Sequence, residues 1–188
     1  MKLDIPYYSQ FDGITMLEWK EKGCAPTCLK MCMDFYLEKN KKTAPTIDDL
    51  IKEGETIGAY LENVGWKHDG LVRVAHNHGV PAYAEEFRSV EVDVLNKTFS
   101  DNPLQGDLID IGIQRIRNSL DKGTPVIVSI QNHVGSHQVV VTGYEDNLGS
   151  TTGFYISDPD NRNSEKKGVF MPMTDFLAIW RKFAIFVG

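Results

Sequence analysis

The first half of the chain places apolar residues at helical spacing. In residues 25–39, APTCLKMCMDFYLEK, apolar side chains recur every three or four positions. The segment TIDDLIKEG offers a helix start, because the Thr46 hydroxyl can cap it with Asp49 at the capping-box distance. In DGLVRVAHNHG we expect Asp69 to cap a third helix and Gly79 to end it. The pattern predicts helices at residues 25–39, 46–54, 69–79 and 108–123.

The pattern changes in the second half of the chain. The segments TPVIVSI, HQVVVTGYE and GFYISDP are rich in β-branched and aromatic residues and are bounded by turn residues, which is typical of antiparallel strands. A further helix at 173–182 and a last strand at 183–188 follow. Helices first and a sheet afterwards indicate an α+β fold. No repeat or linker divides the chain, so we expect a single domain over residues 1–188.

Composition and charge narrow the function classes. The 188 residues are 41% hydrophobic and 24% charged, which is ordinary for a soluble globular protein. The net charge of −6 disfavours a nucleic-acid partner, because binding to phosphates depends on clustered Lys and Arg. No apolar run is long enough for a transmembrane segment. We therefore expect a soluble, folded protein that has neither a nucleic-acid partner nor a transmembrane segment.

The cysteines indicate a reducing compartment. All three lie within nine residues, at positions 24, 28 and 32, and an odd, crowded set cannot form a disulfide framework. The N-terminal residues MKLDIPYYSQ lack the apolar run of a secretory signal. We expect a cytoplasmic location, or a secreted one if a signal peptide has been removed.

Cys24 differs from the other two cysteines in its position. It lies after Gly23 at the predicted helix start, where free backbone N–H groups and the helix dipole favour a reactive thiolate. Cys28 and Cys32 lie one and two turns further along and are expected to pack in the core as small apolar residues. A metal site is the alternative. Structural zinc normally needs four ligands at characteristic spacings, which this segment does not supply, so no metal or organic cofactor is expected.

A catalytic thiolate needs a base and a group that orients the base. His137 opens one predicted strand and Asp158 closes the next, 21 residues later, so tight antiparallel pairing would bring them together. Either residue alone is common, as a strand-end histidine or as part of an Asp-Pro turn. His133 is the rival base, but it lies in a loop. We prefer His137 because a strand holds a base in register with its acid better than a loop does.

The fourth candidate is an amide donor. The tetrahedral intermediate of acyl transfer carries an oxyanion, which a side-chain amide and the backbone N–H of the nucleophile can stabilise. Gln10 precedes Cys24 by 14 residues and is the candidate donor.

Five segments occur in the chain in this order: IPYYSQ, GCAPTCLKM, GTPVIVSI, HQVVVTGY and ISDP. In these segments the chain resembles the bacteriocin-processing cysteine peptidases and in particular their stand-alone relatives in the papain-like superfamily. The resemblance runs from about residue 5 to the final strand. It implies a papain-like fold, with the nucleophile helix packed on the C-terminal sheet. By motif, it implies Cys24 as nucleophile, His137 as base, Asp158 as orienting acid and Gln10 in the oxyanion hole.

Two features depart from the family pattern. Ala25 stands where the family usually has Gly or an acidic residue, and the interval between Gln10 and Cys24 is longer than in the leader-processing members. Gln105 and Gln131 are therefore alternative oxyanion donors. The implied activity is cleavage of a peptide or related amide bond, in a peptide or protein substrate, through a thioester. Two alternatives stay open: an acyltransferase that uses the same thioester, and a catalytically silent peptide-binding module.

Overall fold

The protein is described by a computed structural model that covers residues 1–88, 90–93, 98–101, 106–133, 135–162 and 166–188. The helical elements are α1 (Gln10–Gly13), the 3-10 turn η1 (Leu17–Trp19), α2 (Cys24–Glu38), α3 (Ile47–Thr56), α4 (His68–Asn77), α5 (Gly106–Asp121) and α6 (Met173–Ile179). The strands are β1 (Tyr60–Leu61), β2 (Gly65–Trp66), β3 (Ala82–Glu86), β4 (Val90–Asp93), β5 (Thr98–Asp101), β6 (Val126–Gln131), β7 (Ser136–Asn147), β8 (Ser150–Ser157), β9 (Val169–Pro172) and β10 (Trp180–Val187).

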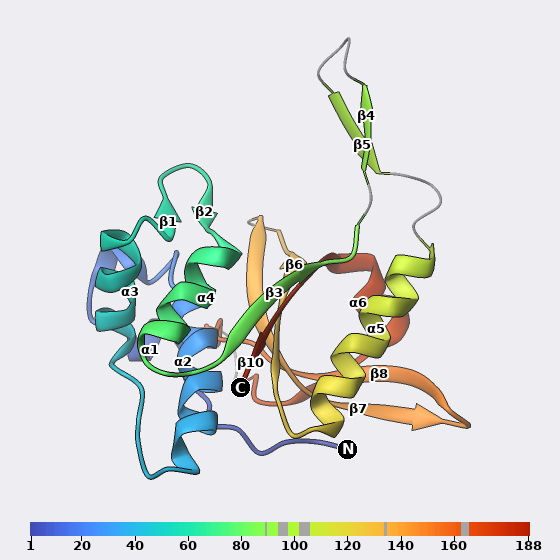
Figure 1. The fold of residues 1–188 in the computed structure, drawn as a ribbon, viewed down its shortest axis with the longest axis horizontal. Coiled ribbons are helices and arrows are strands. Elements are labelled where there is room, and N and C mark those ends of the chain that lie inside the picture. Colours follow the sequence, from blue (N-terminus) through green and yellow to red (C-terminus); the bar gives the residue numbers. More distant parts are fainter. Residues whose placement is uncertain (89, 94–97, 102–105, 134, 163–165) are drawn as a thin grey trace.

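A six-stranded antiparallel sheet forms the centre of the fold. Its strand order is β3-β10-β6-β7-β8-β9. Helices α1 to α4 lie on one side of it, and α5 and α6 lie on the other (Figure 1). Two short hairpins, β1-β2 and β4-β5, pair outside this sheet. The second of them projects from the body (Figure 1).

The two faces of the sheet carry two hydrophobic cores. On β6, Ile127 packs with the cluster around α2 and α4, whereas Val126 and Val128 pack with the cluster around α5 and α6. Neighbouring residues of a strand point to opposite faces, so a sheet covered on both faces needs apolar residues at consecutive positions. This explains why the segment TPVIVSI reads as a continuous apolar run.

Most of the predicted elements are confirmed. Helices α2, α3, α4 and α5 occupy the four predicted segments, and β6, β7 and β8 the three predicted strands. Thr46 caps α3 and accepts a hydrogen bond from Asp49 N at 3.2 Å. The prediction that Asp69 caps the third helix is wrong, because Lys67 is the N-cap of α4. Asp69 lies inside the first turn, where it pairs with Arg73 at 3.1 Å.

The C-terminal helix is shorter than predicted. It ends at Ile179, and Trp180 already pairs with Ile130 as the first residue of β10. The pairing shifts register before Ala184, next to Lys182, which has a positive φ of 61°. Because of this irregularity, the start of β10 could not be recognised from the sequence pattern. The edge strands β3 and β9 were not predicted, since AYAEE and VFMP lack the alternation of a half-buried strand.

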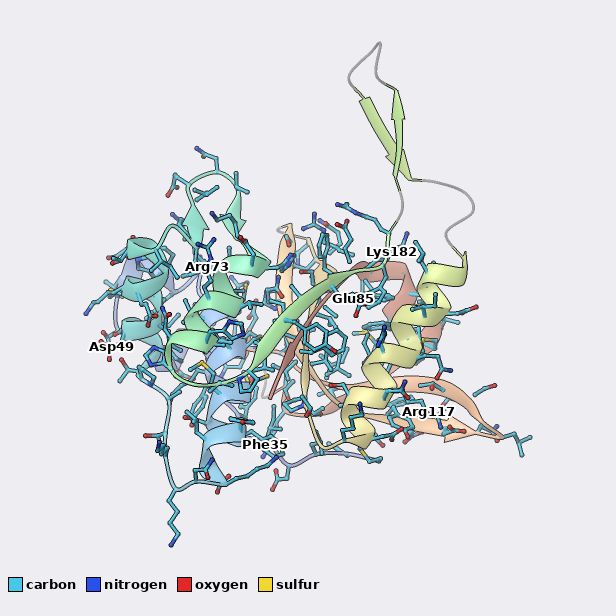
Figure 2. The ribbon with its side chains drawn as sticks, viewed as in Figure 1. Phe35, Asp49, Arg73, Glu85, Arg117 and Lys182 are labelled. Carbon is cyan, nitrogen blue, oxygen red and sulfur yellow. The ribbon has the colours of Figure 1, made fainter. Side chains whose placement is uncertain are left out.

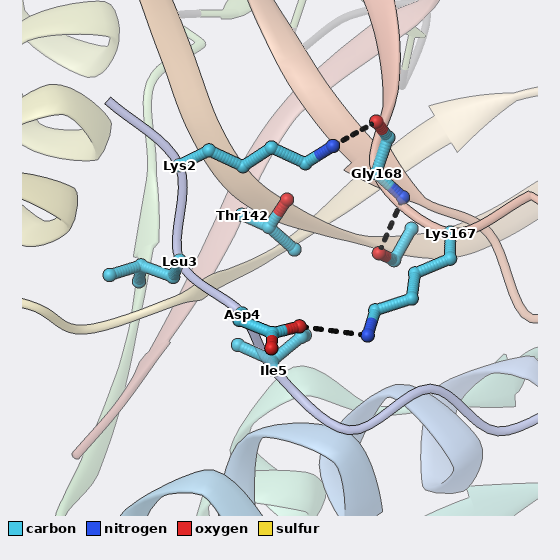
Figure 3. A pocket seen from close by; sticks show the side chains of 8 residues that line it. Lys2, Leu3, Asp4, Ile5, Thr142, Lys167 and Gly168 are labelled. Atoms are coloured by element: carbon cyan, nitrogen blue, oxygen red, sulfur yellow. Dashed lines mark hydrogen bonds and ion pairs between the residues drawn. The ribbon is translucent and has the colours of Figure 1, made fainter.

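The N-terminal segment is fastened to the sheet by charged side chains (Figure 3). Lys2 donates to Gly168 O at 2.8 Å, and Lys167 pairs with Asp4 at 2.8 Å. These residues line a cavity of about 300 Å³. The segment is therefore held against the sheet as it runs towards Gln10, the first residue of α1.

Helix α5 is joined to β7 by polar side chains, and Tyr144 Oη donates to Asp121 Oδ1 at 2.6 Å. Arg117 forms an ion pair with Asp146, and its guanidinium lies 4.8 Å from the centre of the Tyr144 ring (Figure 2). These contacts lie in the layer of the fold that is opposite α2.

Candidate active site

Cys24 is the first residue of α2 and is half-buried. The preceding Gly23 is the N-cap and has no room for a side chain, because a Cβ there would lie 2.9 Å from Trp19 O and 2.1 Å from Ile14 Cδ1. Thr27 N donates to Gly23 O at 3.1 Å. The close packing of Gly23 thus sets the turn that delivers the thiol to the helix N-terminus, where an anion is favoured.

His137 and Asp158 are brought together by the pairing of β7 with β8. Val140 pairs with Ser157, the last residue of β8, and Asp158 follows directly. His137 Nε2 lies 2.7 Å from Asp158 Oδ1, and the histidine is only 6% exposed. Asp158 also accepts from Asp160 N at 2.9 Å and from Lys166 Nζ at 3.3 Å. The predicted juxtaposition of His137 and Asp158 is therefore present.

The charged forms of His137 and Asp158 stabilise each other. Burial lowers the pKa of His137, but the hydrogen bonds and charges of Asp158 and Cys24 outweigh burial and raise the pKa to about 10. Burial raises the pKa of Asp158, but His137, the Asp160 amide and Lys166 together hold it below its usual range. At neutral pH the pair is an imidazolium with a carboxylate, and Cys24 faces a positive charge.

Gln10 is hydrogen-bonded to the turn that precedes Cys24. Its side chain is 3% exposed, and its Nε2 donates to Lys20 O at 2.7 Å. Its Oε1 is buried and has no hydrogen-bond partner among the described residues. The amide is therefore fixed to the turn that leads into the nucleophile helix.

The loop that carries Asp158 is tied to the segment that carries Gln10. Gln10 N donates to Pro159 O at 3.0 Å, and Tyr7 Oη donates to Asp158 O at 2.8 Å. Ser9 Oγ, which also caps α1, donates to Asn161 Oδ1 at 2.6 Å. Two segments about 150 residues apart in the sequence thus hold one side of the site in a fixed geometry.

Two of the three rival candidates lie in the described part of the chain, and both are exposed. His133 is exposed in the loop between β6 and β7. Gln131 is exposed at the end of β6 and donates to the neighbouring Asn132 O at 3.2 Å. Gln105 lies outside the described residues.

A pocket of about 180 Å³ opens beside Cys24. Its wall includes Trp66 and Tyr60 from the β1-β2 hairpin and Gln138 from β7. Trp66 thus lies in the pocket wall, whereas Trp180 lies in the core. Tyr60 and Gln138 were not predicted from the sequence as wall residues. The signal for Gln138 was a polar residue at the start of the apolar run VVV.

Comparisons with known proteins identify the family of the chain and its fold. The sequence profile described as "Peptidase_C39 like family" matches residues 2–184. The chain belongs to this family. A comparison with curated proteins found no match.

Two solved structures share the fold of this Peptidase_C39 like protein. One is a double glycine motif protease from an AMS/PCAT transporter in complex with the leader peptide, at 16% identity and a TM-score of 0.55, covering 99% of this chain and 93% of that chain. The other is the peptidase domain of Streptococcus ComA, a bi-functional ABC transporter involved in a quorum sensing pathway. It has 16% identity and a TM-score of 0.53, covering 89% of this chain and 92% of that chain. The predicted papain-like α+β fold is confirmed.

The two inner cysteines of this Peptidase_C39 like protein lie in the core, as predicted. Cys28 and Cys32 are both fully buried, and burial raises the pKa of each thiol. Cys28 Sγ donates to Gln138 O at 3.3 Å. Among the described residues, no group of three or more His, Cys, Asp and Glu side chains is arranged to hold a metal ion. A helix long and apolar enough to cross a membrane is likewise not found in the described part of the chain.

Proposed function

We propose that this protein is a thiol-dependent peptidase in which Cys24 is the nucleophile and His137 is the base. Asp158 orients His137, and Gln10 helps to stabilise the oxyanion. The observation that carries the proposal is the 2.7 Å hydrogen bond between His137 Nε2 and Asp158 Oδ1, next to a cysteine at a helix start. Thiol hydrolases need such a nucleophile, base and orienting acid in contact.

In this proposal each ring nitrogen of His137 has one role. Because Nε2 is bound to Asp158, Nδ1 is the nitrogen that exchanges protons with Cys24 and the substrate. The Cys24 thiolate attacks the amide carbon and forms a C–S bond. The carbonyl oxygen becomes an oxyanion, held by the Cys24 backbone N–H and a Gln10 N–H.

Collapse of this intermediate breaks the C–N bond. His137 donates its proton to the leaving amine, and a thioester on Cys24 remains. His137 then takes a proton from water, the hydroxide attacks the thioester, and the carboxylic acid leaves as Cys24 is regenerated. An amine in place of water would give acyl transfer from the same thioester.

A peptide substrate is supported by two observations. The pocket beside Cys24, at about 180 Å³, is smaller than the roughly 300–1,000 Å³ of sites that enclose a whole ligand, so it suits one part of a longer chain. The related transporter protease was solved with a leader peptide bound.

Product analysis tests the proposal. We expect the protein to cleave members of a mixture of synthetic peptides, seen by mass spectrometry, and expect Cys24→Ala to abolish cleavage. Adding hydroxylamine separates hydrolysis from acyl transfer, because a transferase yields mainly hydroxamate. Alkylation of Cys24 without cleavage of any peptide would favour a binding module and contradict the proposal.

Gln10→Ala tests the oxyanion role separately. Alkylation builds no oxyanion, so iodoacetamide should label Cys24 at nearly the normal rate, while peptide cleavage falls by roughly a hundredfold or more. Unchanged cleavage in Gln10→Ala would remove Gln10 from the site.

A further inference from the structure

Gln138 is a buried polar residue in the wall of the Cys24 pocket that has no role in the reaction steps above. It follows His137 on β7 and pairs with Ser129 on β6. It is only 5% exposed. On the face of the sheet that packs against α2, its neighbours along β7 and β6 are the apolar Val140 and Ile127. Burying a polar side chain among apolar residues costs free energy, so its presence there indicates a structural or functional role.

Two side chains from distant segments hold the Gln138 amide. Its Nε2 donates to Ser129 Oγ at 2.6 Å and lies 3.2 Å from His68 Nε2. His68 Nε2 lies 2.9 Å from the same Ser129 Oγ, and its ring stacks on Phe183 with centroids 4.5 Å apart. Burial, aided by the charge of Arg181, lowers the pKa of His68, so the ring is neutral and can accept at Nε2. The N–H side of the amide is thus fixed.

The other end of the amide is left free. Gln138 Oε1 is buried and has no hydrogen-bond partner among the described residues. Nearly all buried polar groups are hydrogen-bonded, so a buried acceptor that is held rigidly without a partner, on a residue that lines a pocket, indicates a site for a donor from outside. The pocket that Gln138 lines also contains Cys24.

The wall contributed by the hairpin is aromatic and is also fixed. Tyr60 and Trp66 lie with ring centroids 5.3 Å apart, and Trp19 packs against both rings. Trp66 Nε1 donates to Lys22 O at 2.8 Å, two residues before Cys24. The pocket therefore combines this aromatic wall with the polar side chains of Glu21, Ser136 and Gln138 beside the nucleophile.

We propose that Gln138 is a substrate-binding residue whose Oε1 accepts a hydrogen bond from a backbone N–H of the peptide residue in this pocket. Trp66 and Tyr60 cover the apolar atoms of the same residue. Ser129 and His68 are positioning residues that hold the amide. The inference rests on the proposed peptidase function and adds the acceptor that aligns the chain next to Cys24.

The test measures how fast peptide electrophiles modify Cys24, so it does not depend on turnover. A tripeptidyl vinyl sulfone is compared with the three compounds in which one backbone N–H is replaced by N–CH3. Rates are measured in the unchanged protein, in Gln138→Leu, in Gln138→Glu and in Gln114→Leu, a control on the exposed face of α5. Comparing each probe across variants isolates the pairwise contribution.

We expect one N-methylated probe to react roughly tenfold or more slowly with the unchanged protein, because a buried acceptor loses its donor. In Gln138→Leu this difference should shrink to within about twofold. Gln138→Glu, which keeps an acceptor oxygen, and Gln114→Leu should retain it. Equal penalties in the unchanged protein and Gln138→Leu, or no penalty for any probe, would overturn the proposal. Iodoacetamide labelling distinguishes this failure from failure of the peptidase assignment, since it needs Cys24 and His137 but no subsite.

Discussion

Replacing Asp158 by Asn should lower the pKa of His137. Asp158 provides the largest favourable hydrogen bond to the imidazolium, and Cys24 provides the next. A hydrogen bond to a charged group is worth roughly 1.5–3 kcal/mol, and one pKa unit corresponds to about 1.4 kcal/mol. The pKa of His137 should therefore fall from about 10 to roughly 8–9.

Histidine-selective NMR measures this directly, because the chain has five histidines and His137→Gln assigns the signal. Asp160→Asn is the matched control, since the Asp160 carboxylate binds Arg162 at 2.6 Å. An unchanged His137 titration in Asp158→Asn, or an equal shift in Asp160→Asn, would show that the Asp158 carboxylate does not raise the pKa of His137.

The same shift has a consequence for stability. A histidine whose folded-state pKa is raised from 6.5 to about 10 stabilises the fold fully below pH 6.5, and this contribution is lost as the pH rises towards 10. In Asp158→Asn the loss should be complete at a lower pH. Urea unfolding at several pH values follows it.

Two further predictions concern packing. Cys28→Ala and Cys32→Ala should each lower the free energy of unfolding by roughly 1 kcal/mol in urea titrations and leave turnover largely intact. Stoichiometric zinc in the purified protein that is lost in either variant would contradict the core assignment. Gly70→Ala places a Cβ 2.6 Å from Ala59 Cα. Strain of roughly 1–3 kcal/mol should therefore outweigh a helix-propensity gain of up to about 1 kcal/mol and lower the melting temperature. An increase in the melting temperature would show that α4 and the segment at Ala59 can separate without cost.

Local sequence patterns were sufficient to predict the positions of candidate residues that depend on one helix start or on two successive strands. Cys24 follows from a helix start, and His137 with Asp158 follows from two successive strands joined by a short turn. Both depend on spacing within one or two elements, which hydrophobic periodicity reports well.

The surroundings of Gln138 and Gln10 depend on contacts between segments that are distant in the sequence, and these could not be predicted. Gln138 meets His68 across 70 residues, and Gln10 is tied to Pro159 across 149. No periodicity carries such information. The start of α4 at His68 was missed for a similar reason: its cap, Lys67, makes no side-chain capping bond, and Lys67 N instead donates to Ala59 O at 2.8 Å.

The most direct test of the account is the pH dependence of Cys24 alkylation by iodoacetamide. An ordinary thiol is almost fully protonated at pH 6, so fast labelling there requires a thiolate held by His137. Peptide mapping should find Cys24 modified well before Cys28 and Cys32. Burial alone would protect those two, so the deciding comparison is with His137→Ala. We expect the rate at pH 6 to be lower by at least roughly tenfold in His137→Ala and to converge with that of the unchanged protein near pH 10, and we expect a normal profile in His133→Ala. The same pH profile with and without His137 would rule out His137 as the partner of the Cys24 thiolate.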